Sequence, residues 1–132
     1  MRLYPPVPGI GRAIKETRQF GDFEVRKGTQ IFVMQYLVHR DQRYFDDPDE
    51  FRPERWLDGL ERELPRCSYF PFSDGPRICI GAHFAMLEML TVLPAIVQRS
   101  RLATPDDQPL TLDPGLTLRP GSCTTMNIER RE

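Results

Sequence analysis

Cys79 is the residue of this 132-residue sequence whose surroundings best fit a chemical role. It lies in the stretch FSDGPRICIG, residues 72–81, directly before a long apolar run that predicts a helix. Unpaired N–H groups and the dipole at a helix N-terminus favour an anion, and so favour a thiolate over a thiol. Arg77 lies two residues away and can pair with a carboxylate. The pattern therefore indicates a thiolate that is available as a metal ligand.

Two glycines in the same stretch, Gly75 and Gly81, permit backbone conformations or close approaches that a side chain would block. The alternative for a lone cysteine before a helix is a buried structural thiol in a glycine-bearing turn, because free cysteine is among the most buried residue types. Residue type and position alone leave both interpretations open.

Other metal ligands are few. The sequence has three cysteines (Cys67, Cys79 and Cys123) and two histidines (His39 and His83). The odd number, the wide spacings and the lack of a Cys-x-x-Cys pair argue against a disulfide framework and a structural zinc site. We expect the other two cysteines to be incidental thiols and both histidines to be surface or packing residues. A metal at Cys79 must use few protein ligands, which fits a porphyrin that supplies four nitrogens.

One strong helix is predicted. Residues 82–98 are apolar nearly all round, which indicates a buried helix, and Pro94 should kink it or mark its last turns. A short helix is expected at 36–41, whereas residues 42–71 should be mostly irregular. The first residues resemble the tail of a helix stopped by Pro5.

Short strands are predicted elsewhere. One run, 19–25, carries a turn at Gly21, and a second run at 30–34 is β-rich and apolar. The runs 116–118 and 124–128 are interpreted as a hairpin. The fold class is thus α+β.

Composition excludes several classes of protein. The net charge is −1 with both signs scattered, which gives no reason to expect a nucleic acid partner. No apolar run reaches the length of a membrane span, and the N-terminus lacks a signal-peptide pattern. We expect a soluble, cytoplasmic protein, with a membrane anchor unlikely for this chain.

Five residues in the 72–81 stretch follow the pattern Phe-x-x-Gly-x-Arg-x-Cys-x-Gly, which matches the haem-binding signature of the cytochrome P450 superfamily at every fixed position. Residues 51–56 (FRPERW) resemble its Pro-Glu-Arg-Phe-type motif, with Trp56 where Phe is commoner. Segments 38–48 and 2–8 are similar to the approach to that motif and to the end of its Glu-x-x-Arg helix. The resemblance implies a mainly α fold with small β-sheets. Residues 1–132 would be the C-terminal haem-binding portion of a single domain, with the N-terminal portion absent.

The resemblance also implies roles for individual residues. Cys79 would ligate the iron of haem b (iron protoporphyrin IX) as thiolate, and would be the catalytic residue. Arg77 and Arg12 would hold the haem propionates, and Phe72 would pack beside the sulfur. Gly81 would help to shield the thiolate, and Ala85 would let the helix lie against the ring. Segments 7–10 and 116–117 match regions that often line the substrate pocket.

The resemblance also predicts that one partner of a buried ion network is missing from the sequence. Arg2 aligns with the arginine of the Glu-x-x-Arg motif, whose glutamate also pairs with the arginine matching Arg55. That glutamate would precede residue 1, and no acid–threonine helix is found in the sequence. Removing one partner from a buried ion network costs about 3–5 kcal/mol. We therefore expect a fragment that folds poorly alone.

The activity implied by the resemblance is that of a haem-thiolate monooxygenase. It would oxidise a small apolar substrate with dioxygen and with electrons from a donor such as a ferredoxin or a flavoprotein reductase. Exposed basic residues near the cysteine would suit an acidic donor. The alternatives are a peroxide-using or hydroperoxide-rearranging haem-thiolate enzyme, or a non-catalytic haem-binding remnant.

Overall fold

The computed structural model describes residues 1–57, 59–105, 110–121 and 125–131. The chain divides into two compact units. The first contains Met1–Pro71 with Leu116–Leu118, and the second contains Phe72–Gly115 with Arg119–Glu132. Each unit is described by itself below.

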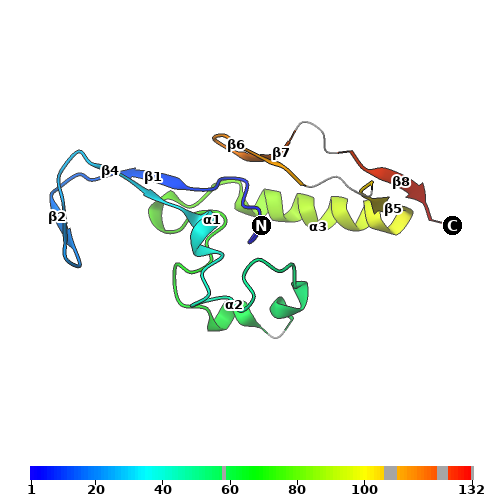
Figure 1. Ribbon diagram of the computed structural model, residues 1–132, viewed down its shortest axis with the longest axis horizontal. Helices are drawn as coiled ribbons and strands as arrows, with labels where there is room; N and C mark the ends of the chain where they lie inside the picture. Colours follow the sequence, from blue (N-terminus) through cyan, green and yellow to red (C-terminus); the bar gives the residue numbers. More distant parts are fainter. Residues whose placement is uncertain (58, 106–109, 122–124, 132) are drawn as a thin grey trace. The chain divides into compact units, whose positions relative to one another are not determined.

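Two antiparallel ribbons form the first part of unit one. Strand β1 (Ile10–Ala13) pairs with β4 (Gln30–Val33), and β2 (Arg18–Phe20) pairs with β3 (Phe23–Val25). The β2–β3 hairpin lies at the far end of the β1–β4 ribbon (Figure 1). Its turn has Gly21 at φ +57°, in the left-handed region that favours glycine. The predicted strands and the turn between them are confirmed.

Short helices and loops complete unit one. They are α1 (Gln35–Val38), the 3₁₀ helix η1 (Pro53–Trp56) and α2 (Leu60–Glu63). The expected short helix and irregular segment are confirmed. The helix tail expected at the N-terminus is wrong, because the first nine residues have no helical turn. Main-chain bonding to other segments takes its place, as Pro8 accepts a hydrogen bond from the Tyr36 N–H at 3.0 Å.

A long helix, α3 (Ala82–Arg99), dominates unit two, and strands β5 (Ser100–Ala103) and β8 (Asn127–Arg130) pair antiparallel at its C-terminal end (Figure 1). The extent of the helix is confirmed, and it continues through Pro94. Its predicted burial is wrong for this chain. No α3 residue is buried, and Leu87 and Leu90 are 65% and 67% exposed. Within the unit, α3 mainly contacts β5, a short strand that leaves its apolar sides uncovered.

The predicted hairpin between 116–118 and 124–128 is also wrong where it falls on described residues. Strand β7 (Leu118–Pro120) pairs with β6 (Leu112–Pro114), and β8 pairs with β5. Pro114 ends β6 and Gly115 follows it, and these two turn residues favour this tighter reversal. Residues 122–124 of the expected hairpin lie outside the described part of the chain.

Candidate functional site: the cysteine loop

The loop at Cys79 is closed by main-chain hydrogen bonds. The Cys79 N–H donates to the Phe72 carbonyl oxygen at 2.9 Å, and the Ile78 N–H donates to Gly75 at 3.1 Å. The Asp74 carboxylate accepts from the Gly75 N–H at 2.6 Å, at the start of the 3₁₀ helix η2 (Gly75–Arg77). The loop therefore has a defined conformation that depends on its own backbone.

The two glycines of this loop differ. Gly75 has φ +74°, a conformation that L side chains rarely adopt, so the shape of the loop at this position favours glycine. Gly81 has φ −88°, and a Cβ there would meet only the Cys79 Sγ, at 3.9 Å. The expectation of a special backbone conformation is thus met at Gly75, whereas at Gly81 the missing side chain leaves open space beside the sulfur.

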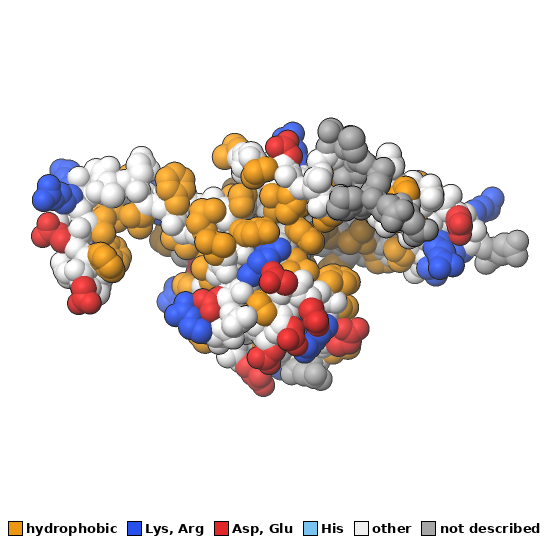
Figure 2. All heavy atoms as spheres, viewed as in Figure 1, with side chains coloured by type: hydrophobic (Ala, Val, Ile, Leu, Met, Phe, Trp, Pro, Cys, Tyr) orange, Lys and Arg blue, Asp and Glu red, His pale blue; other side chains and the backbone are white. Residues whose placement is uncertain are grey.

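Cys79 is exposed, which excludes a buried structural thiol in this chain. Its neighbours Ile78 and Ile80 are 59% and 103% exposed, and Phe84 on the first turn of α3 is 72% exposed. Hydrophobic side chains also lie at the surface over α3 on the face shown in Figure 2. Apolar side chains that face solvent thus flank Cys79 in the chain and continue onto the first turn of α3. Cys67 is exposed as well, and Cys123 lies outside the described residues.

The start of α3 follows directly from the loop. Gly81 is its N-cap residue, the Ala82 N–H donates to the Cys79 carbonyl at 3.3 Å, and the Ala85 N–H donates to Gly81 at 2.9 Å. Phe72 and Ala85 are partly buried, whereas Arg77 is exposed. Five of the predicted site residues therefore share one loop-and-helix segment of unit two.

The sixth predicted residue, Arg12, lies on β1 of unit one, opposite Ile31 of β4. Its guanidinium donates to the Gly11 carbonyl at 2.8 Å. Unit one also brings together the two segments expected near a substrate, since the Leu118 N–H donates to the Pro6 carbonyl at 2.7 Å. That bond places residues 116–117 beside the start of segment 7–10.

A metal at Cys79 would need donors from outside the protein. Among the described residues, no group of three or more His, Cys, Asp or Glu side chains is placed to hold a metal ion. An exposed thiol among apolar side chains, with open space at Gly81, fits a flat apolar ring that brings its own nitrogen ligands. The residues present are thus suited to haem.

The comparison with protein families is decisive for the class of this chain. The family model for Cytochrome P450 matches residues 1–125. The chain belongs to the cytochrome P450 family. The members of this family are haem-thiolate monooxygenases, and their cofactor is a haem.

Individual relatives agree. This cytochrome P450 chain is 38% identical to mouse Cytochrome P450 4V2 over 132 residues. The matched region covers 99% of the chain and 25% of the relative. It is 45% identical over 98 residues to Probable cytochrome P450 4d20 of Drosophila melanogaster, covering 74% of the chain and 19% of the relative. The chain spans about a quarter, or less, of the length of these curated relatives.

Solved structures confirm the fold. The heme domain of cytochrome P450DA superposes with a TM-score of 0.91 at 30% identity, covering 99% of the chain and 29% of that structure. Retinoic acid-bound cyanobacterial CYP120A1 gives the same score and identity, covering 98% of the chain and 30% of that structure. The predicted α+β part of a cytochrome P450 fold is therefore confirmed. Among the described residues, no helix has both the length and the apolar character that crossing a bilayer requires.

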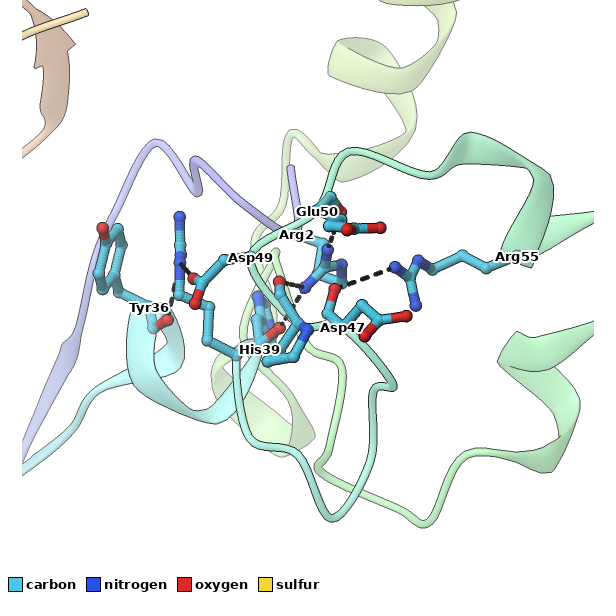
Figure 3. Close-up of polar contacts among 9 residues, drawn as sticks. Arg2, Tyr36, His39, Asp47, Asp49, Glu50 and Arg55 are labelled. Carbon is cyan, nitrogen blue, oxygen red and sulfur yellow. Dashed lines mark hydrogen bonds and ion pairs between the residues drawn. The ribbon is translucent and has the colours of Figure 1, made fainter.

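A second polar centre of this cytochrome P450 lies around Arg2 in unit one (Figure 3). Arg2 is only 6% exposed, and its guanidinium donates to the carbonyl oxygens of His39 and Glu50, both at 2.9 Å, and to that of Pro48. It also lies over the Phe45 ring, 5.1 Å from the centroid. Burial lowers the pKa of Arg2, and the positive charge of Arg55 lowers it further.

The expectation that Arg2 and Arg55 are left without their carboxylate needs refinement. No ion pair of Arg2 is found among the described residues, but carbonyl oxygens take the place of a carboxylate. Arg55 likewise donates to the Asp46 carbonyl at 2.9 Å. Hydrogen bonds to these dipoles offset part of the cost of burying the charge. The contacts join positions about 37 to 48 residues apart, so local sequence gave no signal for them.

Proposed function

We propose that residues 1–132 are the C-terminal haem-binding portion of a single cytochrome P450 domain, and that Cys79 ligates the iron of haem b as a thiolate. The single observation that carries this proposal is the exposed Cys79 thiol, held by a closed loop and flanked in the chain by the exposed apolar side chains of Ile78 and Ile80. Membership of the family supports the cofactor class, and the local geometry supports the residue.

The other predicted residues complete the proposed site. The Arg77 guanidinium is exposed on the cysteine loop and is available to a haem propionate, which it would bind through charge-assisted hydrogen bonds. Arg12 would bind the second propionate. Phe72 would pack beside the sulfur. The small residues Gly81 and Ala85 would let the porphyrin approach the backbone at the start of α3.

The proposed reaction is oxidation of a small apolar substrate. When bound, haem supplies activation of dioxygen and transfer of one oxygen atom, with electrons from a ferredoxin or a flavoprotein reductase. The protein contributes an anionic sulfur donor at Cys79, charge complementarity at Arg77, and apolar contacts from Ile78, Ile80 and Phe84. Residues 7–10 and 116–117 would contact the substrate.

The test is a spectrum of the chain reconstituted with haem b, reduced and exposed to carbon monoxide. A thiolate ligand gives an unusually red-shifted Soret band, which should be lost in Cys79→Ser. Cys67→Ser is the matched control, because Cys67 is also an exposed cysteine but lies outside the loop. The same red-shifted band in Cys79→Ser, or its loss in Cys67→Ser alone, contradicts the assignment.

A further inference from the structure

His39 is fully buried in unit one, directly after α1 (0% exposed). Its Nε2 accepts a hydrogen bond from the Phe70 N–H at 3.0 Å. The imidazole also contacts the rings of Tyr69 and Phe70, with centroids 5.0 and 5.2 Å away. One side chain thus holds the main chain and two side chains of a segment that lies 31 residues further along.

The bond requires an uncharged ring. Because Nε2 accepts, the proton of the neutral imidazole must lie on Nδ1. Nδ1 is buried and has no hydrogen-bond partner among the described residues. A second proton on Nε2 would point at the Phe70 N–H, so two donors would face each other. Protonation therefore removes the bond and leaves further buried polar hydrogens without an acceptor.

The charged groups around His39 oppose protonation too. From the N-terminal segment, the amino group of Met1 and the guanidinium of Arg2 face it, and Arg2 donates to the His39 carbonyl. Arg40 follows it in the chain and is paired with Asp49 of the next loop at 3.2 Å. On the anchored segment, Tyr69 is the titratable residue whose ring contacts the imidazole. Burial, and then the charge of Arg2, lower the pKa of His39 to about 4.

The anchored segment is preorganised. Ser68 is buried, and its N–H and hydroxyl both donate to the Pro65 carbonyl, at 3.1 and 2.6 Å. Residues 65–68 thus form a turn held by its own bonds, and the His39–Phe70 bond joins the end of this segment to the C-terminal end of α1. The segment runs directly into the cysteine loop, which begins at Phe72.

We propose that His39 is an acid-sensitive anchor: its neutral imidazole holds residues 65–70 against α1, and its protonation releases them. The anchor is independent of the iron ligand, so its test and the test of the proposed function can fail separately. Above pH 6.5 the ring is neutral in both states and the anchor holds. As the pH falls from about 6.5 to about 4, the released state binds the proton more tightly and gains population.

The chain contains its own reporter of this release. Trp56 is the single tryptophan, and its ring centroid lies 4.8 Å from that of Tyr69. Release of residues 65–70 separates the two rings and exposes the indole. The tryptophan emission should therefore shift to longer wavelength between pH 6.5 and 4 in the unmodified chain.

Two variants assign the transition. His39→Gln keeps an acceptor oxygen near the position of Nε2 but does not titrate, so its emission should not show this shift. His83→Gln is the matched control, since His83 is the other histidine and is exposed on α3, and it should behave like the unmodified chain. An identical curve in all three proteins overturns the proposal.

A measurement on the unmodified chain avoids any effect of the glutamine on folding. The His39 ring, followed by NMR, should titrate below its ordinary value of about 6.5, shifted toward about 4. The protection of the Phe70 amide against hydrogen exchange should fall roughly 60-fold between pH 7 and 4.5, as two pKa values of about 6.5 and 4 require. A His39 ring that titrates near 6.5, or an unprotected Phe70 amide at pH 7, overturns the proposal.

Discussion

Unit one buries polar side chains and bonds them to its own chain, whereas unit two exposes apolar side chains around its functional loop. Arg2 and His39 are nearly inaccessible, and each has a hydrogen-bond partner far along the sequence. On α3, Phe84 and Leu90 are more than half exposed, and the Cys79 loop is held by local main-chain bonds. Unit one therefore depends on long-range side-chain contacts, whereas the shape of the cysteine loop is encoded locally.

The largest expected effect contrasts two phenylalanines. Phe45 is 1% exposed beneath Arg2, so Phe45→Ala should lower the free energy of unfolding of unit one by about 3–5 kcal/mol. Phe84 is 72% exposed, so Phe84→Ala should change stability little. Urea unfolding followed by Trp56 fluorescence for the first variant, and by helical circular dichroism for the second, measures both. Equal losses of stability in the two variants would contradict the difference in burial between the two units.

The next effect concerns the buried charge. Arg2→Met keeps much of the side-chain volume but leaves the His39, Pro48 and Glu50 carbonyls without their donor. We expect a loss of about 2–3 kcal/mol in the free energy of unfolding. Arg18→Met is the control, because Arg18 forms an exposed ion pair with Glu16 at 3.1 Å and should matter little. A similar small effect in both variants would show that the carbonyl bonds do not stabilise unit one.

The smallest effect tests whether the cysteine loop is encoded by its own backbone. Gly75→Ala forces a side chain into φ +74° and should destabilise the loop by roughly 1–2 kcal/mol. Gly81→Ala should leave the chain without haem unaffected, since its Cβ would have an ordinary contact with the Cys79 sulfur. Exchange of the Cys79 amide, which is bonded to Phe72, reports the loop. Greater loss of protection in Gly81→Ala than in Gly75→Ala contradicts this assignment.

Local features of the fold could be predicted from the sequence. The bounds of α3 follow from a mainly apolar run after Gly81, and the β2–β3 turn follows from Gly21. The 72–81 stretch identified the cysteine loop because its five fixed residues lie within ten positions. These features depend on residues within about ten positions of one another, so a single segment of sequence contains the information.

Other features depend on contacts between distant segments. The apolar residues all round α3 show that the helix can be buried on every side, but they do not show which segments pack against it. The pairing of β8 with β5 joins Ser100 to Arg130, and no local turn signals it. The His39–Phe70 bond likewise spans 31 positions, so His39 was predicted only as a surface or packing residue, and the packing alternative is the one confirmed.

The way Arg2 is bound has a consequence for ionic strength. Its partners are carbonyl dipoles in the interior, so dissolved ions neither reach them nor screen a charge–charge attraction between them. The surface ion pairs, such as Arg18 with Glu16 and Arg52 with Asp47, are open to screening. Raising the salt concentration should therefore loosen the periphery of unit one while its centre keeps its bonds, which makes the interior of this unit tolerant of salt.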